Sequence, residues 1–306
     1  MKIVATSPSF SKNLLLQSKL QKNFSNEFKL NLDGKRFSSS ELIDFIGDAE
    51  TLIVGLEELN EEVLRQLPKL KLISKYGVGL NNIDLDYCKK TGVQIGWTGG
   101  VNKLSVAEMT LGYMLMLSRN LYQSSNELKS GIWNKNGGVL LSEKSIGIIG
   151  VGHIGKEVIR LLSPFNCKIF VNDIIEQKEF YEKNNVIEIS KERIFKECDI
   201  ISIHTSLNDD TENMIDLATL KMMKNSAYVI NSARGGIINE NDLKLALQND
   251  FIAGAAIDAY IEEPPKDKEF LSLPNLICTP HIGGNAQEAV EAMGLSAIKH
   301  VMEYYL

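Results

Sequence analysis

The chain has 306 residues, of which 44% are hydrophobic and 24% are charged, a balance that excludes disordered, collagen-like and coiled-coil proteins. Its 33 Lys and Arg against 39 Asp and Glu give a net charge of −6 without a long basic run, so the composition argues against nucleic acid or an anionic membrane as a partner. A length of this order predicts about two domains, and we expect a small soluble ligand.

The cysteines and the N-terminus carry no signal for metal binding or export. Cys88, Cys167, Cys198 and Cys278 are widely spaced without a CxxC pair, so we expect reduced thiols, no zinc site and no disulfide framework. The first ten residues lack the apolar region of a signal peptide. The longest strongly apolar stretch, 109–118, is about half of a membrane span. The cytoplasm is therefore the expected location.

Strand-like and helix-like patterns alternate in the first hundred residues, which predicts a small parallel domain. We expect strands at 2–6, 51–54 and 71–74 and helices at 11–22 and 60–66. Four glycines within 92–100 mark a crossing between domains.

A long apolar helix is expected at 101–119. Ser105 and Glu108 match a capping box, with a start one turn earlier, at Asn102, as the alternative. The interior of this helix is apolar nearly all round, so we expect it to lie buried at the domain junction rather than in a membrane. The polar segment 120–141 then predicts an extended arm or loop.

The alternation resumes more densely from residue 144 onward. Strands are expected at 146–150, 168–172, 200–204, 227–231, 252–257 and 276–279. Together the two stretches predict an α/β protein with two Rossmann-like domains and parallel sheets.

A dinucleotide-binding motif follows the first strand of this second stretch. Gly150, Gly152 and Gly155 form GxGxxG between that strand and a helical pattern, and Asp173 ends the next strand, 21 residues beyond Gly152. The glycines allow a tight turn and close approach of a pyrophosphate, and the carboxylate can bind a ribose diol. Since two isoleucines and no cation follow Asp173, NAD is favoured over NADP. The alternative is an ordinary tight turn, which the complete strand, loop, helix and acid pattern disfavours.

Three ionisable residues follow other strands of the same sheet. Arg234, Glu263 and His281 are each expected near the carboxyl end of a strand, the edge at which parallel sheets bind ligands. A guanidinium can hold a carboxylate in a bidentate manner, and an imidazole beside a carboxylate can exchange a proton with a carbonyl oxygen. Each residue by itself could be ordinary surface or core, but their common edge favours a hydride-transfer site for 2-oxoacids.

The remaining histidines are weaker candidates for catalysis. His153 lies in the glycine loop, where its backbone would contact the cofactor, and His204 ends a strand that could line the cofactor cleft. His300 lies on the last helix and is expected to be solvated.

With these residues assembled, the chain resembles the D-2-hydroxyacid dehydrogenase family along nearly its whole length. The matched segments are 75–84, Asn102 with 105–108, the Gly150 loop, 231–236, 254–258, 263–264 and 279–284. The resemblance implies Arg234 as substrate binder, His281 as general acid and base, and Glu263 as its partner. The implied NAD-binding residues are Gly150, Gly152, His153, Ile154, Gly155, Asp173, His204, Thr205, Ser232, Ala233, Arg234, Asp258, His281, Gly283 and Gly284.

The resemblance also implies a substrate site and a domain division. The implied substrate residues are Tyr76, Gly77, Val78, Gly79, Asn102, Lys135 and Arg234. Residues 1–98 and 285–306 would form a discontinuous substrate domain, with the NAD-binding domain, 99–284, inserted. Family members are commonly homodimers, so segment 120–141 is expected to reach across to a partner.

Within the family, the segments are most like those of D-3-phosphoglycerate dehydrogenases, with Lys135 approaching the substrate phosphate of the neighbouring subunit. The chain departs from that pattern at 54–58, where Glu57 and Glu58 stand in place of an arginine; Lys75 or Lys103 would have to compensate, although such lysines are more often solvated surface. The leading hypothesis is an NAD-dependent oxidoreductase that acts on a D-2-hydroxyacid, with D-3-phosphoglycerate and 3-phosphohydroxypyruvate as the favoured pair and without an appended regulatory domain. The alternatives are a glyoxylate or hydroxypyruvate type of reductase, or a non-catalytic NAD-sensing module like dehydrogenase-related co-repressors.

Overall fold

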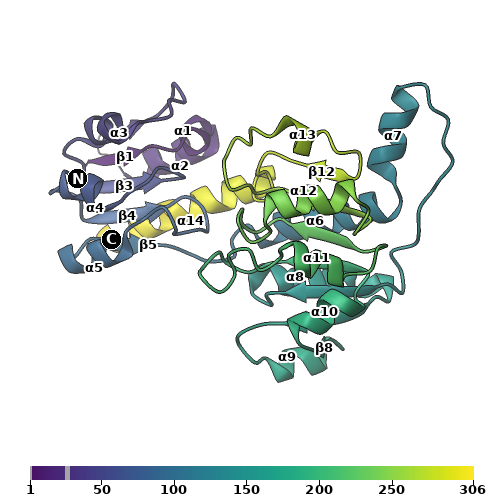
Figure 1. The fold of residues 1–306 in the computed structure, drawn as a ribbon. Coiled ribbons are helices and arrows are strands. Elements are labelled where there is room, and N and C mark those ends of the chain that lie inside the picture. Colours follow the sequence, from purple (N-terminus) through teal and green to yellow (C-terminus); the bar gives the residue numbers. More distant parts are fainter. Residues whose placement is uncertain (1, 25–27) are drawn as a thin grey trace. The chain divides into compact units, whose positions relative to one another are not determined.

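The computed structural model describes residues 2–24 and 28–306. Its internal contacts divide the chain into two units, one formed by Met1–Asn102 with Asn285–Leu306 and the other by Lys103–Gly284. Each unit is built on its own parallel sheet (Figure 1). Hydrophobic side chains form a core on both faces of each sheet. The predicted α/β class with two Rossmann-like sheets is confirmed.

The first unit has a five-stranded parallel sheet in the order β2-β1-β3-β4-β5. Its strands are β1 (Ile3–Ala5), β2 (Phe28–Leu30), β3 (Thr51–Val54), β4 (Leu72–Lys75) and β5 (Gln94–Gly96). Side chains alternate between the faces, so Val4 and Leu52 pack in one core and Ile3 and Ile53 in the other. The strand order reverses between β1 and β3, and ligands bind at the carboxyl ends of strands at such a reversal.

The helices of the first unit cover both faces of this sheet. They are α1 (Pro8–Lys12), α2 (Leu14–Asn23), α3 (Ser39–Ile46), α4 (Glu61–Arg65), α5 (Leu85–Thr91) and α14 (Gln287–Tyr305). The single helix predicted at 11–22 is wrong. Asn13 ends α1 and caps α2, because its side chain accepts a hydrogen bond of 3.1 Å from the amide of Leu16 in the first turn of α2.

The last helix, α14, packs on the first sheet. Ser74 in β4 donates to the carbonyl of Ala297 at 2.8 Å. A Cβ at Gly294 would lie 2.2 Å from the Leu16 side chain, so this glycine lets α14 approach α2 closely. The expectation that His300 is solvated is wrong: its side chain is 16% exposed and its Nε2 lies 2.8 Å from Thr98 Oγ1, because α14 turns this residue toward β5.

The second unit has a seven-stranded parallel sheet in the order β12-β11-β10-β9-β6-β7-β8. The strands are β6 (Ser145–Ile149), β7 (Lys168–Asn172), β8 (Ile187–Glu188), β9 (Ile200–Ile203), β10 (Tyr228–Asn231), β11 (Gly254–Ile257) and β12 (Leu276–Cys278). The order reverses between β6 and β9, as in dinucleotide-binding sheets. Six of these strands were predicted, whereas β8 is a two-residue exposed strand at the sheet edge.

Helices cover both faces of the second sheet as well. They are α6 (Lys103–Ser118), α7 (Leu121–Lys129), α8 (His153–Leu162), a 3₁₀ turn (Ser163–Phe165), α9 (Lys178–Lys183), α10 (Lys191–Glu197), α11 (Leu217–Met222), α12 (Glu240–Gln248) and α13 (Lys268–Leu271). The long apolar helix α6 packs against α8, β10 and β11. Because it begins at Lys103, the capping box at Ser105 is wrong and the alternative start at Asn102 is the better description.

Segment 120–141 differs from the predicted extended arm in its first half, which forms α7. The remainder is irregular, and α7 and this loop project from the body of the second unit (Figure 1). The arm returns to the end of α6, where Val139 donates to the carbonyl of Ser118 at 2.7 Å. Large apolar side chains on it are open to solvent, including Trp133 at 77% and Leu140 at 66% exposure.

The cysteines are free thiols, with Cys88 and Cys198 buried and Cys167 and Cys278 partly buried. Burial raises the pKa of Cys88 to about 11 and that of Cys198 to about 12, so both remain protonated near neutral pH. Within residues 2–24 and 28–306, no three His, Cys, Asp or Glu side chains gather as they would around a metal ion. Over those residues, we find no helix whose length and apolarity would let it cross a membrane.

Candidate active site

The glycine loop joins β6 to α8 at the reversal of strand order. Gly150 has φ of +94°, and a Cβ there would lie 2.5 Å from the carbonyl oxygen of His204. A Cβ at Gly155 would lie 2.1 Å from the carbonyl oxygen of Gly150. A Cβ built on Gly152 would meet nothing within 4 Å beyond its chain neighbours, and α8 begins without a side-chain cap from the described residues. This open space before an uncapped helix N-terminus fits a pyrophosphate, and it involves the backbone of the predicted His153 and Ile154.

Asp173 ties the end of β7 to the glycine loop. Its carboxylate accepts hydrogen bonds from the amides of Val151 at 2.5 Å and Ile175 at 2.8 Å. The next two residues, Ile174 and Ile175, are uncharged, so neither offsets the charge of the carboxylate. Ile174 is 99% exposed. The position agrees with a carboxylate that binds a ribose diol and repels a 2′-phosphate; the ribose contact itself stays a prediction.

His204 lies beside the glycine loop at the carboxyl end of β9, before Thr205. Its amide donates to the carbonyl of Ile149 at 2.7 Å, and its Nε2 lies 2.9 Å from Ser202 Oγ. Nδ1 is buried and has no hydrogen-bond partner among the described residues. Burial lowers the pKa of His204 to about 4, so this imidazole is neutral near pH 7.

Arg234 is held by a tight turn after β10. Asn231 Oδ1 accepts from the amide of Ala233 at 3.0 Å, and Asn231 Nδ2 donates to the carbonyl of Arg234 at 2.8 Å. A Cβ at Gly235 would lie 2.0 Å from the Tyr260 backbone, so the turn requires glycine there. The guanidinium donates to the carbonyl of Ala233 at 2.7 Å. Burial lowers the pKa of Arg234 and the Glu263 carboxylate opposes this, which leaves a partly desolvated cation suited to an anionic ligand.

His281 and Glu263 form the pair that the sequence predicts. Nδ1 of His281 lies 2.8 Å and 2.9 Å from the two carboxylate oxygens of Glu263. The amide of Tyr260 donates to the same carboxylate at 3.1 Å and fixes it. A carboxylate on Nδ1 leaves Nε2 as the ring nitrogen that can exchange a proton with a ligand. Both side chains keep about 40% exposure and are therefore accessible to a ligand.

Asp258 fixes the loop that carries His281. It is 1% exposed, and its carboxylate accepts from Thr279 Oγ1 at 2.5 Å and from the amides of Ile282 at 2.9 Å and Gly283 at 2.8 Å. His281 has φ of +54°, a left-handed conformation that is uncommon for a residue other than glycine. The NAD-binding role implied for Asp258 stays a prediction, but its contacts make it a residue that positions His281.

Helix α6 supplies supporting contacts that the sequence analysis missed. Ser105 Oγ donates to the carbonyl of Gly283 at 2.6 Å, and Thr110 Oγ1 lies 3.1 Å from Ser232 Oγ. The hydroxyls of Tyr113 and Thr279 are hydrogen-bonded, and burial raises the pKa of Tyr113. Ser105, Thr110 and Tyr113 are polar side chains on a mostly apolar helix, and this pattern could have indicated that they form such contacts.

The predicted substrate segment Tyr76, Gly77, Val78 and Gly79 follows β4 in the first unit. Gly77 has φ of +134°, so the chain turns sharply there. The carbonyl of Val78 accepts from Trp97 Nε1 at 2.9 Å, which fixes the turn. Asn102 is buried, and its Oδ1 has no partner in the described part of the chain.

The structure therefore gathers the predicted cofactor and catalytic residues of the second unit along one edge of its sheet, including Gly284 after the His281 loop. Lys135 is exposed on the arm, and the structure brings it to none of them in this chain. The substrate contacts of these residues stay predictions.

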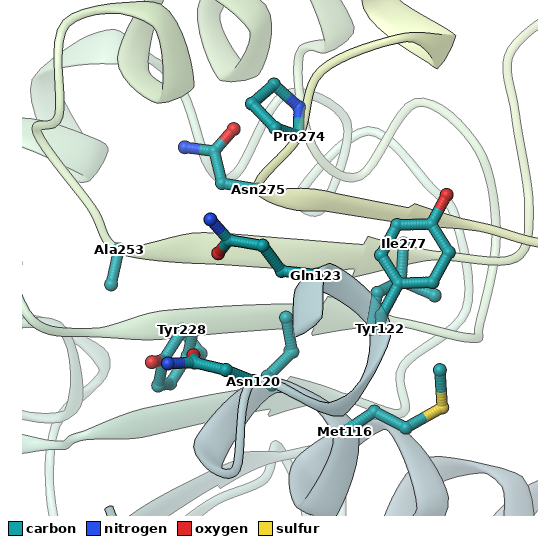
Figure 2. A pocket seen from close by; sticks show the side chains of 10 residues that line it. Met116, Asn120, Tyr122, Gln123, Tyr228, Ala253, Pro274, Asn275 and Ile277 are labelled. Atoms are coloured by element: carbon teal, nitrogen blue, oxygen red, sulfur yellow. The ribbon is translucent and has the colours of Figure 1, made fainter. Parts of the chain in front are cut away.

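A separate pocket lies at the opposite edge of the second sheet (Figure 2). Tyr228, Ala253 and Asn275 line it at the amino ends of β10, β11 and β12, and Asn120 and Gln123 line it from the start of the arm. Since Arg234 and His281 follow the carboxyl ends of strands, this pocket is distinct from the candidate active site.

Fold and site together define a dinucleotide-binding protein of the dehydrogenase class. Residues 111–283 match the family model described as D-isomer specific 2-hydroxyacid dehydrogenase, NAD binding domain. The chain therefore belongs to the D-isomer specific 2-hydroxyacid dehydrogenases, and the expectation of NAD as cofactor is confirmed.

Individual relatives agree with this family and differ in substrate. The chain is 36% identical over 261 residues to D-3-phosphoglycerate dehydrogenase of Methanocaldococcus jannaschii, with 84% of this chain and 50% of that protein covered. It is 31% identical over 285 residues to hydroxypyruvate reductase of Thermotoga maritima, with 91% and 92% covered. The chain thus spans half the length of the first of these relatives.

Solved structures show the same fold. A crystal structure of D-lactate dehydrogenase from Aquifex aeolicus, complexed with NAD and lactic acid, has a TM-score of 0.84 and 26% identity, covering 99% of this chain and 95% of that one.

Proposed function

We propose that this protein catalyses reversible hydride transfer between NAD(H) and carbon 2 of a D-2-hydroxyacid or its 2-oxoacid. The observation that carries the proposal is the His281–Glu263 pair at 2.8 Å, on the same sheet edge as Arg234 and the glycine loop. An acid and base, a carboxylate-binding cation and a dinucleotide loop are the parts that this reaction requires.

In the reduction direction, each residue has a separate task. Bound NADH supplies the hydride. Nε2 of His281 donates a proton to the 2-oxo oxygen, while Glu263 on Nδ1 stabilises the imidazolium that donates it. Arg234 holds the substrate carboxylate and polarises the adjacent carbonyl. Asp258 keeps His281 in place through the amides of Ile282 and Gly283.

The two units would divide these tasks. Residues 99–284 would bind NAD, and 1–98 with 285–306 would bind the substrate, whose carboxylate would meet the backbone of Val78 and Gly79 with Asn102 nearby. The orphaned Oδ1 of Asn102 and the sharp turn at Gly77 support a ligand site in this segment.

The relatives suggest three candidate substrates, of which one carries a phosphate. The name of the relative from M. jannaschii favours D-3-phosphoglycerate, with Lys135 of a neighbouring subunit on the phosphate. The relative from T. maritima, matched over nearly its full length, favours hydroxypyruvate, and the Thermococcus litoralis relative favours glyoxylate. Glu57 and Glu58 at the end of β3 favour an acid without phosphate.

A homodimer formed through the NAD-binding unit and the arm, 120–141, is part of the proposal. The exposed Trp133 and Leu140 on a projecting segment support it, because apolar side chains this open usually meet a partner. Light scattering of the purified protein should give twice the chain mass, and a monomer at working concentration would rule out both the dimer and the role of Lys135.

The decisive experiment is NADH consumption by purified protein offered a panel of 2-oxoacids, with NADPH in parallel. Turnover of at least one acid, with NADH preferred, supports the proposal. If no acid is turned over while capture of partner proteins depends on NADH, the protein is an NAD-sensing module instead.

A further inference from the structure

The carboxyl ends of β1, β3 and β4 meet at the point where the strand order of the first sheet reverses. We call the side chains of Ser9, Glu57, Lys75 and Tyr76 at this point the switch-point cluster. Under the proposed function this cluster adjoins the substrate segment, which begins at Tyr76. Its contacts indicate which chemical group the substrate carries at carbon 3, the end of the molecule opposite the carboxylate, which we call the far end.

Lys75 is the cation of the cluster, and it is committed to the protein. The side chain is 4% exposed, so the expectation that it is solvated surface is wrong. Its ammonium donates to the carbonyl of Gly55 and to Asn82 Oδ1, the latter at 2.6 Å. Asn82 Nδ2 in turn donates to the carbonyl of Glu57 at 2.6 Å. Lys75 therefore holds the loop after β3 against the loop after β4. Turning its ammonium group toward a ligand would break these hydrogen bonds.

Glu57 places a negative charge at the reversal point. Its Oε2 accepts from the amide of Gly55 at 2.9 Å. A Cβ built on Gly55 would lie 3.0 Å from Ser7 Cβ and 3.5 Å from Glu57 Oε2, so the carboxylate sits where β1 and β3 end. The second lysine considered for this role, Lys103, lies 3.7 Å from Glu157 in the second unit.

Tyr76 supplies a polar group that the protein does not satisfy. Its ring packs edge-on against Phe10 at 5.6 Å between centroids, which fixes the side chain. The residue is 7% exposed, and its buried hydroxyl has no hydrogen-bond partner in the described residues. Burial raises the pKa of Tyr76 and hydrogen bonding from the Ser9 side chain opposes the rise, so the Ser9 hydroxyl lies near the Tyr76 hydroxyl without making a well-formed hydrogen bond to it. A buried hydroxyl without a partner is costly unless a ligand completes it.

We infer that the switch-point cluster selects a 2-oxoacid whose far end is an uncharged hydroxymethyl group, as in hydroxypyruvate, and rejects its phosphate ester. A hydroxymethyl group can donate to the Glu57 carboxylate and pair with the Tyr76 hydroxyl. A phosphate dianion would meet the Glu57 carboxylate, and Lys75, the cation of the cluster, is held by Gly55 and Asn82. Glyoxylate, which has no group at this end, would leave Tyr76 unsatisfied.

The test compares kcat/KM for hydroxypyruvate, 3-phosphohydroxypyruvate and glyoxylate, with NADH saturating. For the wild-type protein, hydroxypyruvate should exceed the phosphorylated acid by about tenfold or more, the discrimination expected when one ligand pairs buried polar groups and the other meets repulsion. A preference for 3-phosphohydroxypyruvate would overturn the inference.

Charge variants locate the source of the preference. Glu57→Arg should shift the ratio of the two acids toward the phosphorylated one by about tenfold or more. Glu58→Arg is the matched control, because Glu58 is exposed and the same charge change there should shift the ratio by less than about twofold. Glu57→Gln keeps the residue size and a hydrogen-bond acceptor, so it tests the same point if the arginine variant does not fold. Equal shifts from Glu57→Arg and Glu58→Arg would show a general charge effect and overturn the assignment to Glu57.

Tyr76→Phe tests the hydroxyl separately. It should lower kcat/KM for hydroxypyruvate by about tenfold and change that for glyoxylate by less than about twofold. Equal losses with both acids would show that Tyr76 acts on the fold rather than on the far end of the substrate. Failure of the proposed function is distinct from all these outcomes, because it would abolish turnover of every acid in the wild-type protein.

Discussion

The two sheets are wound in the same way, yet their ligand edges are built differently. The edge of the second sheet holds Arg234, Glu263 and His281 on loops fixed by neighbouring backbone, with the imidazole and carboxylate left accessible. The edge of the first sheet holds its cation, Lys75, inside the protein, with the Glu57 carboxylate partly exposed and the Tyr76 hydroxyl buried. Under the proposed function, the edge of the second sheet would carry out the reaction, and the edge of the first sheet would determine which acid is accepted.

The difference has an electrostatic side. The partly desolvated guanidinium of Arg234 would bind the carboxylate that every 2-oxoacid possesses. The ammonium of Lys75, in contrast, donates its hydrogen bonds to Gly55 and Asn82 within the protein. Variants at the second edge should therefore lower turnover with all acids alike. Variants at the first edge should change the ranking of acids.

The largest effect is expected at His281. Removing the proton donor with His281→Ala should lower kcat by about 10³-fold or more, within the range for loss of a general acid. NADH affinity, followed by the fluorescence of bound NADH, should stay nearly unchanged, because the glycine loop is intact. Wild-type turnover in this variant would break the assignment of chemistry to the second edge.

Arg234→Lys should give the next largest loss. Lysine keeps the charge but cannot form the bidentate contact with a carboxylate, so kcat/KM should fall about 10²-fold, with much of the loss in KM. The loss should be similar for hydroxypyruvate and glyoxylate. A loss confined to one acid would mean that Arg234 also recognises the far end of the substrate.

The buried His204 predicts a pH dependence of stability in the second unit. Its pKa is about 4 in the folded protein against about 6.5 when unfolded. Since the unfolded state binds more protons between these values, stability should be present above pH 6.5 and fall as the pH drops toward 4. The loss between pH 7.5 and 5 should be about 2 kcal/mol. Urea unfolding at both pH values measures it, and His204→Gln should flatten the dependence; an unchanged slope would show that other groups cause it.

The sequence predicted the second unit better than the first. Most of its strands are apolar, and the motifs around Gly150, Arg234 and His281 each follow the end of a strand. Because the strands of a parallel sheet all end at the same edge, these motifs are expected to lie at one edge of the sheet. The three-residue edge strands β2 and β5 were not predicted, because so few residues carry little periodicity. The helices α3 and α5 were also missed, although Ser38 and Glu41 form a capping box at the start of α3. The orientation of His300 toward Thr98 and the burial of Lys75 depend on packing between segments far apart in sequence, which no local pattern encodes.

The site residues that sequence analysis missed were also long-range. Thr279 lies inside a recognised motif, but its bond to Asp258 and the hydroxyl of Tyr113 arises from the packing of α6 against β11. Ser105 matched a capping box, yet its hydroxyl binds Gly283, 178 residues away. Local sequence patterns predicted the helix α6 but could not predict which distant residues its side chains contact.

The smallest effect sharpens this last point. Thr279→Val removes the hydroxyl that donates to Asp258 and leaves the amides of Ile282 and Gly283 to hold the His281 loop. We expect kcat to fall about tenfold, which corresponds to about 1.4 kcal/mol, with KM for NADH within about twofold because the glycine loop is untouched. Thr279→Ser restores the donor and should restore kcat. If the serine variant is as slow as the valine variant, the methyl group of Thr279 matters for packing and the Asp258 bond does not position His281.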